Sequence, residues 1–94
     1  MTIFPGQPTV PFDAVGVASA PAESGVYAIC RADGGYIYFG EAGDLRKRLS
    51  EHLAEPDSCL HRAGAAFFAY EEYPSLAIRM ARRNKLLATY STPC

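Results

Sequence analysis

The sequence of 94 residues lacks tryptophan, and its first 30 residues contain neither lysine nor arginine. It also lacks an apolar run of membrane-spanning length and a basic start followed by an apolar segment, so we expect neither a membrane helix nor a secretion signal. Its three cysteines form an odd number without a metal-binding spacing, which predicts reduced thiols rather than a disulfide framework. These absences together predict a cytoplasmic protein.

Basic residues are present but unevenly distributed, although the formal net charge is only −1. Seven of the nine fall in two predicted helices, and residues 73–94 contain four of them and no acid. The seven are Arg46, Lys47, Arg48, Arg79, Arg82, Arg83 and Lys85. If the two helices lie side by side, they form a basic surface suited to phosphates. If each helix simply faces solvent, no anionic partner is needed, and the charge pattern alone leaves both alternatives open.

The length allows a single domain with a modest core. Residues 1–22 contain four of the seven prolines, separated by short apolar groups. Such a segment predicts a proline-rich N-terminal wrap without regular structure, followed by a domain at residues 23–94.

Local signals then divide this domain into five elements. Asp33-Gly34-Gly35 between two segments rich in β-forming residues predicts a hairpin, and Asp44 is the expected N-cap of the helix that follows. The expected elements are strands at about 25–31, 36–40 and 64–71 and helices at about 44–53 and 75–90. The order β-β-α-β-α predicts an α/β domain of the α+β type, in which helices flank a small, mainly antiparallel sheet of three strands.

Four polar side chains are expected to converge on this fold. In a hairpin with a two- or four-residue loop, Tyr27 and Tyr38 point to the same face of the sheet. Arg48 and His52 are four residues apart on the helix and share a face. Each pair alone is typical of ordinary packing, so only the combination of the four indicates a site.

Together and in this order, these residues resemble the GIY-YIG nucleases. Gly25-Val26-Tyr27 resembles the first half of the motif that names the family, and Tyr38-Phe39-Gly40 resembles the second half at a suitable spacing. The segment Glu41–Leu53 resembles the helix in which the family places a catalytic arginine and then a tyrosine or histidine. These two positions are Arg48 and His52, and the resemblance covers about residues 21–94.

The resemblance implies a GIY-YIG-like fold and metal-dependent hydrolysis of DNA phosphodiester bonds, with one Mg²⁺ or Mn²⁺ ion. By the same resemblance Tyr27 activates the attacking water, Tyr38 and His52 support it, and Arg48 steadies the phosphate. These roles suit the reaction, because a guanidinium and a metal neutralise the charge that develops on phosphoryl oxygens. The expected nucleic-acid-binding residues are Arg46, Lys47, Arg79, Arg82 and Arg83.

The last helix departs from the family pattern. The family places a metal-binding glutamate there, whereas the alignment puts Arg83 at this position and the helix contains no acid. At 100° per residue Arg83 shares one stripe with Leu76, Met80 and Leu87, so it is expected to point inward.

Three explanations of this departure stay open. Arg83 contacts the phosphate directly and the metal is lost, or another acid such as Glu41 or Glu72 holds the metal, or the alignment of the helix is shifted. The resulting alternatives are an endonuclease, intact or weakened, and a catalytically inactive module for binding nucleic acid or protein. A zinc site formed by Cys59, His61 and His52 is disfavoured, because structural zinc requires four ligands with tight local spacing.

Overall fold

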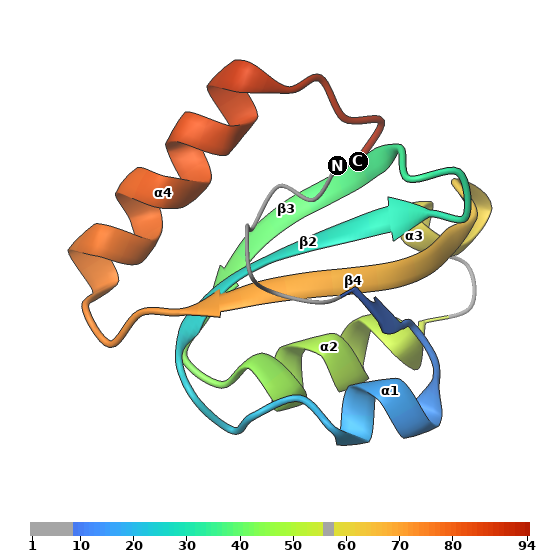
Figure 1. Cartoon of the computed structure of the whole chain (residues 1–94), viewed down its shortest axis with the longest axis horizontal. Helices are drawn as coiled ribbons and strands as arrows, with labels where there is room; N and C mark the ends of the chain where they lie inside the picture. The colour runs from blue at the N-terminus through green and yellow to red at the C-terminus, as the bar shows by residue number, and fades with distance from the viewer. Residues whose placement is uncertain (1–8, 56–57) are drawn as a thin grey trace.

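The computed structural model describes residues 9–55 and 58–94, and in it a mixed sheet-and-helix domain forms around four antiparallel strands (Figure 1). The strands follow the spatial order β1-β4-β2-β3, so that β3 lies at one edge of the sheet. They are β1 (Val10–Pro11), β2 (Gly25–Arg31), β3 (Tyr36–Ala42) and β4 (Ala65–Glu72), and the helices are α1 (Ala14–Ala18), α2 (Leu45–Leu53), α3 (Cys59–Arg62) and α4 (Leu76–Thr89).

Helices cover both faces of the sheet. One core cluster packs side chains of α1, α2 and α3 against β2 and β4, and includes Tyr27, Leu49 and Phe68. The other packs Leu86 of α4 against Phe39 and neighbouring residues on the opposite face. In Figure 1, α4 accordingly lies on the side of the sheet away from α1 and α2. The two basic helices α2 and α4 therefore do not lie side by side.

The predicted α/β class, the hairpin and both long helices are confirmed. Asp33-Gly34-Gly35 forms the turn between β2 and β3, in which Gly34 has the positive φ of 89° that favours glycine. The carboxylate of Asp44 accepts a hydrogen bond from the backbone N–H of Lys47 at 3.0 Å, as expected of an N-cap. Ser75 caps α4 in the same way, by accepting from the N–H of Ile78.

The sheet has a fourth strand in addition to the three predicted, and the N-terminal segment contains regular structure. Val10 and Pro11 pair with β4, and α1 follows with Asp13 as its N-cap. A strand of two residues is too short to show an alternating pattern, which is why the sequence did not reveal it. Residues 1–8 of the predicted wrap lie outside the described residues. The short helix α3, within a stretch predicted to be irregular, begins at the cap Ser58.

The orientation predicted for α4 is wrong for Leu76 and Leu87 but holds in part for Arg83, which is half-buried with its Nε atom buried. Leu76 and Leu87 are 58% and 45% exposed, whereas Arg79 and Leu86 are buried against the sheet. Two ion pairs explain this orientation: Arg79 binds Glu41 on β3, and Arg82 binds Glu71 on β4. They hold the helix face that carries Arg79, Arg82 and Leu86 against the sheet, so the face with Leu76 and Leu87 points outward.

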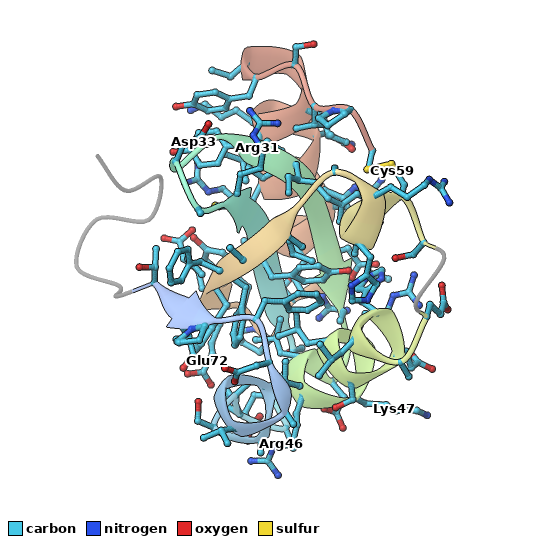
Figure 2. The ribbon with its side chains drawn as sticks, turned by 90° about the vertical axis from the view of Figure 1, so that its right-hand side faces the viewer. Arg31, Asp33, Arg46, Lys47, Cys59 and Glu72 are labelled. Carbon is cyan, nitrogen blue, oxygen red and sulfur yellow. A yellow bond between two sulfur atoms is a disulfide. The ribbon has the colours of Figure 1, made fainter. Side chains whose placement is uncertain are left out.

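The prediction of reduced thiols is wrong for two of the three cysteines. Cys59 at the start of α3 is bonded to Cys94, 35 positions away in sequence (Figure 2). The backbone N–H of Cys94 also donates to the carbonyl of Ile37 on β3. Cysteine count and spacing could not show that the fold brings these two together. Cys30 is a free, buried thiol.

Within the described part of the chain, no helix is long and apolar enough to cross a membrane.

Candidate active site

Tyr27 lies at the centre of the candidate site. It is on β2 opposite Gly40 of β3, and its side chain is almost fully buried at 1% exposed. A β-carbon on Gly40 would overlap the Tyr27 ring, so the glycine of the second motif provides the space in which that ring lies. Tyr38 pairs with Ile29, two residues from Tyr27 on β2, which places both tyrosines on one face as predicted. Their ring centroids are 6.0 Å apart.

His52 of α2 completes an aromatic group with the two tyrosines, in which Tyr27 and His52 are buried and Tyr38 is partly buried. The Tyr27 hydroxyl lies 2.7 Å from Nε2 of His52, and this hydrogen bond is buried. The Tyr38 ring packs edge-on against the His52 ring with centroids 5.5 Å apart. His52 occupies this place because it follows the buried Leu45 and Leu49 on the inner face of α2. Strand pairing and helix periodicity thus bring the three side chains together.

Burial and neighbouring charge set the protonation of this group. Burial, and then the nearby Tyr38, raise the pKa of Tyr27, while the guanidinium of Arg48 acts in the opposite direction. The Tyr27 phenol is therefore protonated at neutral pH. Burial, and then Arg48, lower the pKa of His52, so that its imidazole is neutral. In the tautomer that carries its proton on Nδ1, Nε2 of His52 accepts the hydrogen bond from the Tyr27 hydroxyl.

Arg48 joins this buried group to an open pocket. It interacts with the Tyr27 hydroxyl and forms an ion pair of 3.5 Å with Glu51 one turn further along α2. Both partners of the pair remain about half exposed, so the guanidinium is accessible to a ligand. The pocket has a volume of about 390 Å³ and lies where β3 turns into α2. Its charged lining residues are Glu41, Asp44, Lys47, Arg48 and Glu51.

The five predicted nucleic-acid-binding residues are divided between two faces of the domain. On α2, Arg46 and Lys47 are exposed and point outward (Figure 2), and Nε of Arg46 also donates to the carbonyl of Ala20. On α4, Arg79 is 8% exposed and held by Glu41, while Arg82 is paired with Glu71. Arg83 is half-buried and donates to the Asn84 side chain.

The two weak metal-binding candidates are far from equivalent. Glu41 lines the pocket beside Arg48, but its carboxylate accepts from Nε of Arg79 at 3.1 Å. Glu72 is exposed at the end of β4 and pairs with Gly25 on the neighbouring strand (Figure 2). Among residues 9–55 and 58–94, no three His, Cys, Asp or Glu side chains are grouped so that they could hold a metal ion. The disfavoured zinc set is not available either, since Cys59 is in the disulfide.

Three supporting contacts were missed from the sequence. Glu51 is three residues from Arg48, a helical spacing that could have predicted their ion pair. Gly40 was noted only as part of the motif, although its lack of a side chain accommodates Tyr27. The pair of Arg79 and Glu41 joins residues 38 positions apart, and no local pattern predicts such a contact.

The site thus combines a buried tyrosine-histidine pair with an accessible arginine on a small antiparallel sheet, and the comparisons assign the family. The GIY-YIG catalytic domain profile matches residues 23–87, so the chain belongs to the GIY-YIG family. This membership confirms the resemblance, the nuclease-type function and nucleic acid as the class of substrate.

Solved structures share the fold. The N-terminal GIY-YIG endonuclease domain of UvrC from Thermotoga maritima, bound to its catalytic divalent cation magnesium, is 24% identical with a TM-score of 0.68. Two point mutants of that domain, each bound to its catalytic divalent cation, are 23% and 24% identical and both have a TM-score of 0.69. Each comparison covers 81% of this chain and 86% of the UvrC domain. Among curated proteins, none matches the chain.

Proposed function

We propose that this chain binds the phosphodiester backbone of DNA at Arg48 and hydrolyses it with Tyr27 as the base. The observation that carries this proposal is the buried hydrogen bond of 2.7 Å between the Tyr27 hydroxyl and Nε2 of His52, beside an accessible guanidinium. A buried phenol needs a hydrogen-bond partner in any protein. A proton relay requires more, namely a partner that can take up the proton of the phenol, and a neutral imidazole is such a partner.

The protonation states support a relay between the two residues. A protonated phenol cannot accept a proton from water unless it loses its own. As Tyr27 takes a proton from the attacking water, its hydroxyl proton passes to Nε2 of the neutral His52. The water oxygen bonds to phosphorus, the bond to the leaving oxygen breaks, and solvent protonates that oxygen. Arg48 stabilises the negative charge on the phosphoryl oxygens.

A divalent cation supplies additional charge neutralisation in a reaction of this kind. The residues present here do not fit such an ion well. The sequence of α4 contains no acid, and Glu41, the acid nearest to Arg48 on β3, is bound by Arg79.

The test is nicking of supercoiled plasmid by the full chain in Mg²⁺, in Mn²⁺ and in chelator. We expect Tyr27→Phe and Arg48→Ala to abolish nicking while circular dichroism and melting show an intact fold. Tyr36→Phe is the matched control, because Tyr36 packs on the opposite face against Tyr90. If both site variants cut as well as the wild type, the assignment of the site is wrong.

The second candidate is a binding module without turnover, and the ion pair between Arg79 and Glu41 favours it. This candidate predicts no nicking under any of the three conditions by a folded protein. It also predicts affinity for duplex DNA that falls steeply with salt, because each neutralised phosphate releases counterions. Affinity lost in Arg48→Ala would support binding at this site. Affinity that ignores salt, or no affinity, would indicate a protein partner instead.

A further inference from the structure

Arg79 occupies an unusual place for a basic residue of a surface helix. It is 8% exposed, and its guanidinium is held on several sides. Nε donates to the Glu41 carboxylate at 3.1 Å, and one terminal nitrogen donates to the carbonyls of Tyr73 and Pro74 at 3.4 and 3.2 Å. A guanidinium with this many partners is fixed in position, unlike an arginine that waits for a ligand at the surface.

Glu41 is the link between this fixed guanidinium and the pocket. It belongs to β3, directly after Gly40 on which the Tyr27 ring lies, and it lines the pocket together with Lys47 and Arg48. Among the acids of the described strands, Glu41 alone lines the pocket together with Arg48, the arginine that interacts with the Tyr27 hydroxyl. An oxygen ligand at this place is what a hard divalent cation would require. The guanidinium of Arg79 is already bound to this carboxylate.

The charges around the pocket give this contact a consequence. The acids that line the pocket, Glu41, Asp44 and Glu51, outnumber the basic residues Lys47 and Arg48 by one. Without a further cation, such a surface would repel a phosphate. Arg79 supplies that cation through its ion pair with Glu41, as a metal ion bound to the same carboxylate would.

We infer that Arg79 takes the place of a metal ion on Glu41, so that this pocket receives a phosphodiester of nucleic acid without a divalent cation. The identity of the ligand, a nucleic-acid phosphodiester, rests on the proposed function. That Arg79 blocks metal binding at Glu41 does not depend on that function and can be tested on the protein without DNA. On this basis Arg79, rather than Arg83, is the residue of α4 that replaces the metal. The side chain of Arg83 donates instead to Asn84, which does not line the pocket.

The experiment is a titration of the full chain with Mn²⁺, followed by electron paramagnetic resonance. Wild type is compared with Glu41→Gln, Arg79→Gln and the double variant. Arg82→Gln is the matched control, because Arg82 makes an ion pair of 3.2 Å from the same helix to Glu71, which does not line the pocket.

We expect wild type, Glu41→Gln and Arg82→Gln to bind Mn²⁺ alike. Arg79→Gln should bind one additional ion weakly, because the freed Glu41 carboxylate is a single protein ligand and water must complete the coordination, and the double variant should lose this ion. The inference is overturned if Glu41→Gln removes a Mn²⁺ ion from the wild type, or if a folded Arg79→Gln gains none. Should Arg79→Gln unfold, the comparison of wild type with Glu41→Gln still decides: equal binding supports the inference and a loss overturns it.

A second measurement follows the affinity for a duplex oligonucleotide in Mg²⁺ and in chelator. Wild type should bind equally in both. Arg79→Gln should bind roughly threefold more weakly in chelator, as expected for one screened charge, and should recover in Mg²⁺. Wild-type binding that needs Mg²⁺ and is lost in Glu41→Gln would overturn the inference. If no variant binds DNA, the proposed function fails, while the Mn²⁺ titration still judges the role of Arg79.

Discussion

Tyr27 and His52 are 25 positions apart in sequence, yet the hydroxyl of the first lies 2.7 Å from Nε2 of the second. The bond is buried and crosses from the sheet to α2, so it joins the two halves of the candidate site. Because the two side chains share this bond, a substitution of one changes what a substitution of the other does to stability. This energetic coupling can be measured by denaturation even if the protein does not cleave DNA.

Because the two side chains share one buried hydrogen bond, Tyr27→Phe and His52→Gln should not destabilise the protein additively. We expect a coupling of about 1 kcal/mol in the free energy of unfolding, since either variant alone removes the same bond. Urea denaturation of the wild type, both single variants and the double variant measures it. Pairing Tyr36→Phe with His52→Gln should give additive effects, because Tyr36 lies on the other face of the sheet. Additivity in the first cycle would show that the hydrogen bond contributes nothing to stability.

Gly40 should tolerate no side chain, because a β-carbon there would overlap the Tyr27 ring. Gly40→Ala must displace either the ring or β3, and we expect a loss of about 1–3 kcal/mol in stability together with loss of nicking. Gly43→Ala is the control, since a β-carbon at Gly43 meets no atom within 4 Å. That control should change stability by less than about 0.5 kcal/mol. Equal effects of the two substitutions would contradict the close packing of Tyr27 on β3.

The parts of the site that could be predicted are those set by local patterns. The turn at Asp33-Gly34-Gly35 predicts the hairpin itself. The shared face of Tyr27 and Tyr38 depends in addition on an irregularity between Ile29 and Cys30, where the pairing changes from Cys30 with Tyr36 to Ile29 with Tyr38. Asp44 fixes the start of α2, and helical spacing then places Arg48 and His52 one turn apart. Turn residues, caps and periodicity act within a few positions, so a single sequence shows them.

The remainder depends on contacts between residues far apart in sequence. The orientation of α4 follows from ion pairs with β3 and β4, and Arg79 is 38 positions from its partner Glu41. Helical periodicity placed Leu76 and Leu87 inward because it treats apolar residues as buried and arginines as exposed. Here a paired arginine lies inside and two leucines lie outside, as partner contacts outweigh the average preference.

Stability should fall in mild acid because of His52. Burial and Arg48 lower its pKa in the folded state below the ordinary value of 6.5, so below that pH the unfolded chain binds a proton that the folded one does not. The free energy of unfolding should therefore decrease as the pH falls below about 6.5, by up to about 1.4 kcal/mol per pH unit, and then level once the folded state is protonated. Urea denaturation between pH 7.5 and 5 measures this.

The matched comparison is His52→Gln, in which the carboxylates still titrate but this imidazole does not. Its stability should fall less steeply over the same range than that of the wild type. The same protonation should slow cleavage, because a protonated Nε2 cannot accept the Tyr27 proton. Parallel stability curves for the two proteins would mean that His52 is not held neutral by its surroundings.

The disulfide between Cys59 and Cys94 should make the stability of this domain sensitive to reductant. It closes a loop across 35 positions and holds the chain end against β3, where the N–H of Cys94 donates to Ile37. Reducing the bond raises the conformational entropy of the unfolded chain, which lowers the free energy of unfolding by up to about 4 kcal/mol. This is a large share of the roughly 5–14 kcal/mol of unfolding free energy expected for 94 residues. We expect dithiothreitol to lower the melting temperature by about 10 °C or more.

Cys94→Ser should melt at the lower temperature with or without reductant, whereas Cys30→Ser, which leaves the disulfide intact, should respond to reductant as the wild type does. A wild type that melts at one temperature in both conditions, equal to that of Cys94→Ser, would show that the bond does not stabilise the fold. The chain end would then be held only by its packing and the hydrogen bond to Ile37.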